Sequence, residues 1–86
     1  INNFKEYLSF LKTFNIIVSG AEEIITVSEA EIINSMKIIW ERLKIICEPS
    51  CSLPLAAILK NKSKFRNKSV GIILTGGNID LSNIPF

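Results

Sequence analysis

The chain has 86 residues, of which 48% are apolar and 21% are charged, and it carries a net charge of +2 at pH 7. This length allows one small domain, and the composition is that of an ordinary globular protein, which excludes disorder as the default. The ten Lys and Arg residues are scattered, so the sequence lacks the basic patch expected of a nucleic-acid-binding protein.

The first part of the sequence predicts a helix and then a strand. The helix is expected over Phe4–Lys12, because aromatic and leucine residues recur at helical spacing at Phe4, Leu8 and Leu11, with Phe14 continuing the pattern beyond Lys12. Ser19-Gly20 indicates a turn. Residues 24–27, IITV, form a short β-branched run, which is typical of a buried strand.

A long helix is predicted from Glu29 to about Ile46. It begins with the capping-box sequence SEAE, in which the Ser28 hydroxyl accepts from the Glu31 N–H and the Glu31 carboxylate accepts from the Ser28 N–H. Apolar residues then recur at steps of three and four, at Ile32, Met36, Ile39, Leu43 and Ile46. Pro49 ends the helix, because a proline disfavours the helical conformation of the residue before it.

The rest of the sequence predicts a shorter helix, a charged loop and a second strand. Leu53–Lys60 is expected to be helical, with Pro54 tolerated in its first turn. The loop covers residues 60–69. Val70–Leu74 is continuously apolar, which predicts a strand buried on both faces, as in a parallel sheet. The order helix, strand, helix, helix, strand predicts the α/β class, with helices packed on parallel strands.

The chain has two cysteines, Cys47 and Cys51, and no histidine. These are too few ligands for a zinc site and fewer cysteines than a small disulfide-bonded secreted domain normally uses. We therefore expect buried thiols and no metal site. The sequence shows neither a run of about 20 apolar residues nor a cleavable signal pattern, so no membrane contact and a cytoplasmic location are expected.

Two polar stretches are candidates for chemistry. In the first, the carboxylate of Glu48 lies at the predicted helix break. In the second, Thr75-Gly76-Gly77-Asn78 follows the second predicted strand, and ligands of open α/β sheets bind at such strand ends. A threonine hydroxyl can bond a ring nitrogen, and glycines let a flat ligand approach the backbone. The same residues also fit a plain turn in which Thr75 bonds its own backbone, or a phosphate-binding module.

Three blocks of the sequence, ITVSEAEI, WERLK with EPSCS, and ILTGGN, occur in the same order in one family. They resemble the C-terminal part of the fold-type-II pyridoxal-phosphate enzymes, specifically the threonine dehydratase and serine racemase group. The resemblance is strongest over residues 13–81 and makes residues 1–86 a partial catalytic domain of the tryptophan synthase β-like fold. It implies pyridoxal phosphate as the cofactor of the complete domain and an amino acid as its substrate.

The resemblance implies four cofactor-binding residues. Thr75 matches the hydroxyl residue that bonds the pyridine nitrogen of the cofactor, and Glu48 matches a glutamate near the cofactor. Gly76 and Gly77 are expected to line the ring edge. A neutral hydroxyl, unlike a carboxylate, does not force the nitrogen to be protonated, which favours elimination.

The same resemblance implies that the chain carries no catalytic residue. The reactive lysine of the family lies upstream, and the family's glycine-rich phosphate cradle and divalent-metal site are absent from this sequence. The faintly similar SKFRN at residues 63–67 lacks the Gly-Ala that follows the lysine motif. Cys51-Ser52 replaces the family's Gly-Ala, so Cys51 is expected to crowd the cofactor.

Two hypotheses are consistent with these patterns. In the first, the chain is the C-terminal fragment of a threonine or serine dehydratase, with serine racemase as the alternative enzyme. In the second, it is a stand-alone remnant without catalysis that self-associates or docks on a complementing chain. Either way, the chain alone is expected to be inactive.

Overall fold

The structure is a computed structural model that describes residues 4–86, without the side chains of residues 4–8 and 10. Its elements are helical. In chain order they are the α-helix α1 (Phe4–Gly20), the α-helix α2 (Glu29–Ile38), the π-helical turn η1 (Ile39–Leu43), the 3₁₀ turn η2 (Pro49–Ser52), the α-helices α3 (Leu53–Lys60) and α4 (Lys62–Phe65), and the 3₁₀ turn η3 (Leu81–Asn83).

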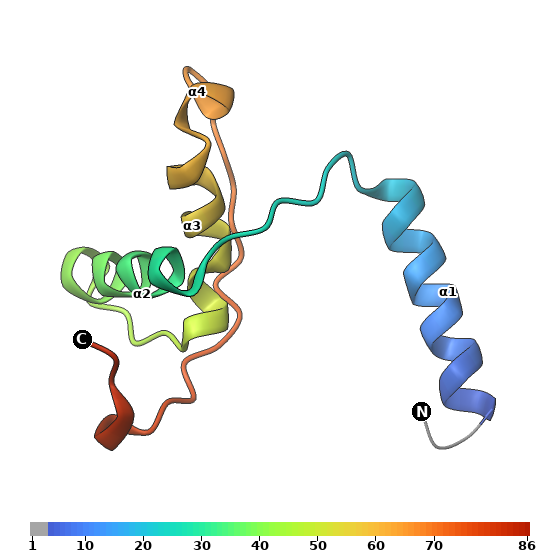
Figure 1. Ribbon diagram of the computed structural model, residues 1–86, viewed down its shortest axis with the longest axis horizontal. Coiled ribbons are helices and arrows are strands. Elements are labelled where there is room, and N and C mark those ends of the chain that lie inside the picture. The colour runs from blue at the N-terminus through green and yellow to red at the C-terminus, as the bar shows by residue number, and fades with distance from the viewer. Residues whose placement is uncertain (1–3) are drawn as a thin grey trace.

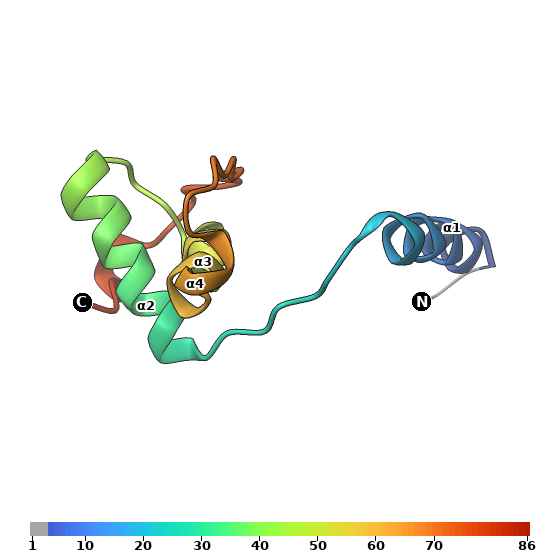
Figure 2. The ribbon, with the colours of Figure 1, turned by 90° about the horizontal axis from the view of Figure 1, so that it is seen from above.

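Helix α1 lies apart from the other helices. Residues 21–28 form an extended connection that separates it from α2 and α3 (Figures 1 and 2). The helix begins at Phe4 as predicted but continues to Gly20, so the predicted end at Lys12 is wrong. Several of its apolar side chains are more than half exposed, namely those of Phe14, Ile16, Ile17 and Val18. The predicted stripe members Phe4 and Leu8 have side chains outside the described residues.

The predicted capping box begins α2. The Ser28 N–H donates to Glu31 Oε1 at 2.7 Å, and the Glu31 N–H donates to the Ser28 hydroxyl at 3.2 Å. The helical stretch ends at Leu43 rather than Ile46, with its last five residues in the π-helical turn η1. Lys44 then adopts a left-handed conformation, with φ 58°, which takes the chain out of the helix before Pro49 is reached.

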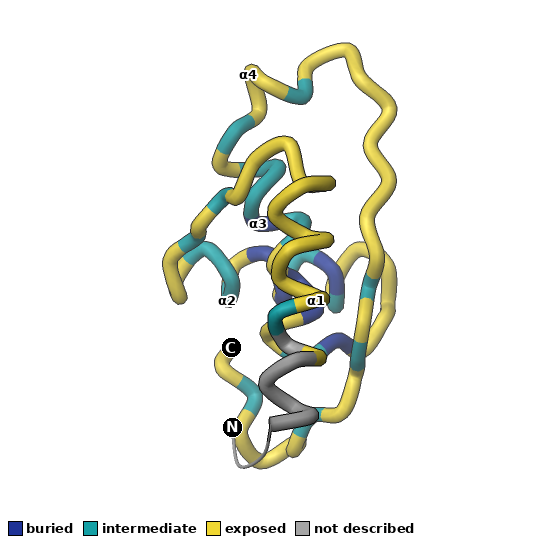
Figure 3. The backbone as a smooth tube through the Cα atoms, turned by 90° about the vertical axis from the view of Figure 1, so that its right-hand side faces the viewer, coloured by how far each residue is buried: buried dark blue, intermediate teal, exposed yellow. Residues whose placement is uncertain are grey.

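The core is small and lies where α2, η1, η2 and α3 meet (Figure 3). It consists of Met36, Ile39, Cys47 and Cys51, with Trp40, Leu55, Leu74 and Ile79 packed against it. The Ser52 hydroxyl fixes η2 against α2, because its single proton is shared between the Ile32 carbonyl, at 2.9 Å from Oγ, and the Pro49 carbonyl, at 2.8 Å. Two members of the predicted stripe, Leu43 and Ile46, are more than half exposed, since the chain turns away from the core at Lys44.

Helix α3 has the predicted bounds, and the predicted loop over residues 60–69 contains the short helix α4. Lysines of this region hold the connection that leads from α1. Lys60 Nζ donates to the Thr26 carbonyl at 2.9 Å, and Lys64 pairs with Glu23. None of the described helices is long and apolar enough to cross a membrane.

Residues 4–86 contain no β-strand, so the predicted strands at 24–27 and 70–74 are wrong for this structure, and the α/β class is not confirmed. Both segments run as extended chain (Figure 1). A strand needs a neighbouring strand to accept and donate its backbone hydrogen bonds, and neither segment has one within residues 4–86. Several of their apolar side chains are therefore left uncovered, with Ile24 and Ile73 each 77% exposed.

Candidate functional site

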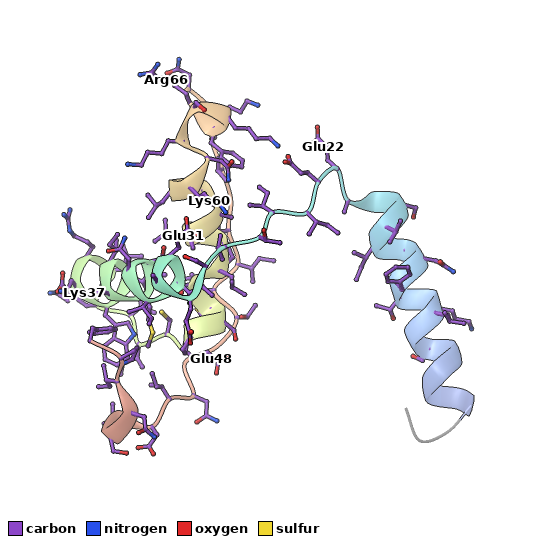
Figure 4. The ribbon with its side chains drawn as sticks, viewed as in Figure 1. Glu22, Glu31, Lys37, Glu48, Lys60 and Arg66 are labelled. Carbon is purple, nitrogen blue, oxygen red and sulfur yellow. The ribbon has the colours of Figure 1, made fainter. Side chains whose placement is uncertain are left out.

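Two stretches that are distant in the sequence come together at the candidate site. Glu48 projects from the loop between η1 and η2 (Figure 4), and its backbone N–H donates to the Gly76 carbonyl at 3.0 Å. The Glu48 side chain lies directly against Gly76, because a Cβ atom built on Gly76 would be only 2.6 Å from Glu48 Oε1. The structure thus brings together two of the residues that the sequence analysis selected.

Gly77 makes an even closer approach to the same loop. A Cβ atom on Gly77 would lie 2.5 Å from the carbonyl oxygen of Ile46, which is backbone and cannot swing away. A residue with a side chain would therefore push the two backbones apart. Close backbone packing is a physical reason for glycine at position 77, whereas at Gly76 the near atoms belong to the flexible Glu48 side chain. The sequence analysis did not foresee the role of Ile46, because no side-chain chemistry marks it.

Thr75 lies at the exposed end of this arrangement. Its side chain is exposed and makes no hydrogen bond to any residue in the described part of the chain, so it does not bond its own backbone as the plain-turn interpretation would require. Leu74 before it and Ile79 after it pack against the core cluster. The loop is therefore anchored at both ends while the Thr75 hydroxyl remains available to a ligand.

The two cysteines are buried and free, and they belong to the core rather than to a reactive site. Burial is the main cause that raises the pKa of Cys47 to about 11, and the neighbouring Cys51 thiol adds to the rise. A thiol with this pKa stays protonated near neutral pH and is a poor nucleophile. Cys51 fills the core beside Met36, so its side chain is accommodated there.

A separate cavity of about 330 Å³ lies between α2 and α3, and it includes none of the four predicted cofactor-binding residues. Lys60 and Glu31 stand on its wall and approach each other from the two helices (Figure 4), with Lys60 Nζ 3.9 Å from Glu31 Oε1. Both groups already have partners, in the Thr26 carbonyl and the Ser28 N–H. The cavity is thus distinct from the predicted site.

The sequence of this chain matches a known protein family. Residues 7–76 match the family described as pyridoxal-phosphate dependent enzyme. The matched region includes Glu48, Thr75 and Gly76, and it covers well over half of the chain.

The chain is also similar to individual proteins of known activity. It is 53% identical over 74 residues to a serine racemase of Dictyostelium discoideum and 49% identical over 74 residues to a β-hydroxyaspartate dehydratase of Paracoccus denitrificans. These alignments cover 84% and 86% of this chain but 23% and 24% of those proteins, so the chain spans about a quarter of their length.

The crystal structure of the Dictyostelium discoideum serine racemase has the same arrangement of the matched elements. It superimposes with a TM-score of 0.74 at 52% sequence identity, over 80% of this chain and 23% of that chain. The two proteins are therefore similar both in sequence and in backbone structure over the matched region.

Proposed function

Because this chain belongs to the pyridoxal-phosphate-dependent enzyme family, in the group of serine racemases and hydroxyaspartate dehydratases, we propose that it forms one side of a cofactor site. The site belongs to an enzyme that acts on a β-hydroxy amino acid. In this proposal residues 1–86 are the C-terminal part of the catalytic domain, and Thr75 holds the pyridine nitrogen of the cofactor. The lysine that binds the cofactor covalently comes from the part of the domain that precedes this chain.

The observation that carries the proposal is the unpartnered, exposed hydroxyl of Thr75 on an anchored loop. The residues present fit this edge of the cofactor. A hydroxyl can donate a hydrogen bond to an unprotonated ring nitrogen, and the loop beside it is kept in place by the Glu48 N–H and the close packing of Gly77 against Ile46. An anchored donor loses little entropy when a ligand arrives.

The cofactor, when bound, supplies the electron-withdrawing ring that makes the α-proton of the amino acid acidic. The contribution of this chain is to orient that ring. Thr75 keeps its own proton on Oγ and offers it to the nitrogen, so the nitrogen is not given a full positive charge. The Glu48 carboxylate lies against Gly76 in the 75–78 loop.

The extended segments 24–27 and 70–74 belong to the same proposal. Both are apolar, and both lack a strand partner within residues 4–86. Since the chain spans about a quarter of its relatives, we propose that these segments become strands of a parallel sheet when the remaining part of the domain, in the same or a complementing chain, pairs with them.

Two reactions remain as candidates for the whole enzyme. One is dehydration of threonine, serine or 3-hydroxyaspartate with release of ammonia, and the other is racemisation of serine. The relatives include proteins named for each type, at similar identity. Both reactions begin with removal of the α-proton, so both are compatible with the same role for Thr75.

A segment exchange tests the proposal. The matching segment of the Dictyostelium discoideum serine racemase is replaced by this chain, and cofactor binding is titrated through the visible absorbance of pyridoxal phosphate. Thr75→Ala should raise the Kd for the cofactor about 10-fold, which corresponds to one hydrogen bond of about 1.4 kcal/mol. Thr75→Ser keeps the hydroxyl and should bind like the parent.

Ser69→Ala serves as the matched control, since it removes an exposed hydroxyl from the same extended segment. Equal affinity of the parent and Thr75→Ala would contradict the role of Thr75. A folded exchange protein that binds no cofactor would contradict the proposed function and favour the stand-alone remnant, which the intact mass of the polypeptide in its source would then test.

A further inference from the structure

Trp40 is the single tryptophan of the chain, and it lies in the π-helical turn η1. Its indole Nε1 donates to the carbonyl oxygen of Cys47 at 2.9 Å. The Phe86 ring packs against the indole in a T-shaped arrangement, with a centroid distance of 5.4 Å and an interplanar angle of 83°. The half-buried indole also packs against the core cluster. The ring is thus held on several sides while its N–H is committed to one carbonyl.

The carbonyl that accepts from Trp40 belongs to the same peptide unit as the Glu48 N–H. That N–H donates to the Gly76 carbonyl at 3.0 Å. A peptide unit is planar and rigid, and its C=O and N–H point in opposite directions. The rigid Cys47–Glu48 peptide therefore connects the Trp40 indole, through its C=O, to Gly76 of the 75–78 loop, through its N–H. Hydrogen bonds in such a chain also polarise and strengthen one another.

The backbone conformation between Trp40 and Cys47 allows the Trp40 N–H to reach the Cys47 carbonyl. Lys44 takes the left-handed conformation with φ 58°, which turns the chain back so that Cys47 comes within reach of Trp40. Trp40 lies in a π-helical turn, and such turns occur frequently at functional sites.

We propose that Trp40 is a positioning residue for the cofactor loop: by fixing the Cys47–Glu48 peptide, it holds Gly76 and so places the Thr75 hydroxyl. This inference rests on the proposed function for its consequence at the cofactor. The mechanical part of the inference, that Trp40 holds the Cys47–Glu48 peptide and thereby Gly76, concerns this chain alone. The two parts are therefore tested separately.

The mechanical part is tested by amide hydrogen exchange at Glu48 in the 86-residue chain. Trp40→Phe keeps an aromatic ring but removes the N–H donor. We expect exchange of the Glu48 amide to become about 10-fold faster, because the Cys47–Glu48 peptide loses one of the two hydrogen bonds that hold it. Phe86→Leu is the matched control: it removes the ring contact on Trp40 but leaves the indole N–H, and Glu48 exchange should stay at the parent rate.

Unchanged Glu48 exchange in Trp40→Phe would overturn the inference, and an equal increase in both variants would assign the effect to ring packing and also overturn it. If circular dichroism shows that Trp40→Phe does not fold, benzothienylalanine is placed at position 40. It keeps the shape of the bicyclic ring and replaces the N–H by sulfur, and the same increase is expected.

The consequence at the cofactor is tested in the exchange protein described above. Trp40→Phe should raise the Kd for pyridoxal phosphate three- to tenfold and alter the visible circular dichroism of the bound cofactor, while Phe86→Leu should change neither. The spectrum reports ring orientation, which a loss of stability alone would not change. If the parent exchange protein binds cofactor and Trp40→Phe matches it in Kd and spectrum, the inference is wrong; if the parent binds none, the proposed function fails instead.

Discussion

Residues 11–27 and the region from α2 to α3 are both rich in apolar side chains, yet they are buried to very different extents. In α1, Ile16 is 71% exposed, whereas Met36 of α2 is completely buried. Both residues lie on helices, so helix formation does not explain the difference. What differs is the neighbour: α2 packs on η2 and α3, while α1 stands apart from them.

This contrast shows that an apolar pattern predicts a buried face but not what covers it. Around Met36 the chain supplies the covering residues itself, from Cys47, Cys51 and Leu55. It does not cover the exposed apolar side chains of α1, such as Ile16, or Ile73 of the extended segment 70–74. Under the proposed function, the covering surface for these segments comes from the rest of the catalytic domain.

The largest expected effect contrasts the two regions directly. Met36→Ala should lower the free energy of unfolding by about 2–5 kcal/mol, because it leaves a cavity in a small core. Ile16→Ala should change it by no more than about 0.5 kcal/mol, because the side chain is mostly in water. Urea unfolding followed by circular dichroism measures both. Similar losses in the two variants would show that α1 is packed in solution.

A second, intermediate effect contrasts two glycines. Gly77→Ala should destabilise the fold by about 1–3 kcal/mol, since the new Cβ would lie 2.5 Å from the Ile46 carbonyl oxygen and the backbone must shift. Gly71→Ala is the matched control, because nothing lies within 4 Å of its Cβ position. Its effect should stay within about 0.5 kcal/mol. Equal unfolding midpoints for the two variants would mean that residues 46–48 and 76–77 are not in contact.

The smallest expected effect concerns Glu31, near the junction of the two regions. Hydrogen bonds from the Ser28 backbone and side chain lower the pKa of Glu31 below its ordinary value of 4.5, and Lys60 adds to this, while slight burial opposes it. A lowered pKa in the folded state means that the stabilisation is complete above the unfolded pKa and disappears as the pH falls through the folded pKa.

Glu31→Gln tests this effect, because the amide oxygen can still accept from the Ser28 N–H but does not titrate. Below about pH 4.5 the parent should lose more stability than this variant, as measured by urea unfolding at several pH values. Asp80, whose pKa is also lowered by Ser82, titrates in both proteins and cancels in the comparison. Parallel pH profiles would contradict the assignment to Glu31.

The sequence by itself determined the local elements of this protein. The capping box at Ser28 and Glu31, the start of α2 and the bounds of α3 depend on hydrogen bonds and proline geometry within a few residues. The family resemblance was also readable, since three short blocks carry it and the family match runs from residue 7 to residue 76. Glu48 and Gly76 could be selected for the same reason.

Only the tertiary structure decided how those residues meet. The contact of Ile46 with Gly77 and the donation from Trp40 to Cys47 involve backbone carbonyls, which leave no mark on the sequence. The end of the helical stretch at Leu43 depends on the left-handed Lys44, a conformation that lysine does not favour on its own. The predicted strands are absent for the converse reason: residues 70–74 have the composition of a strand, but a strand exists only where a second one pairs with it.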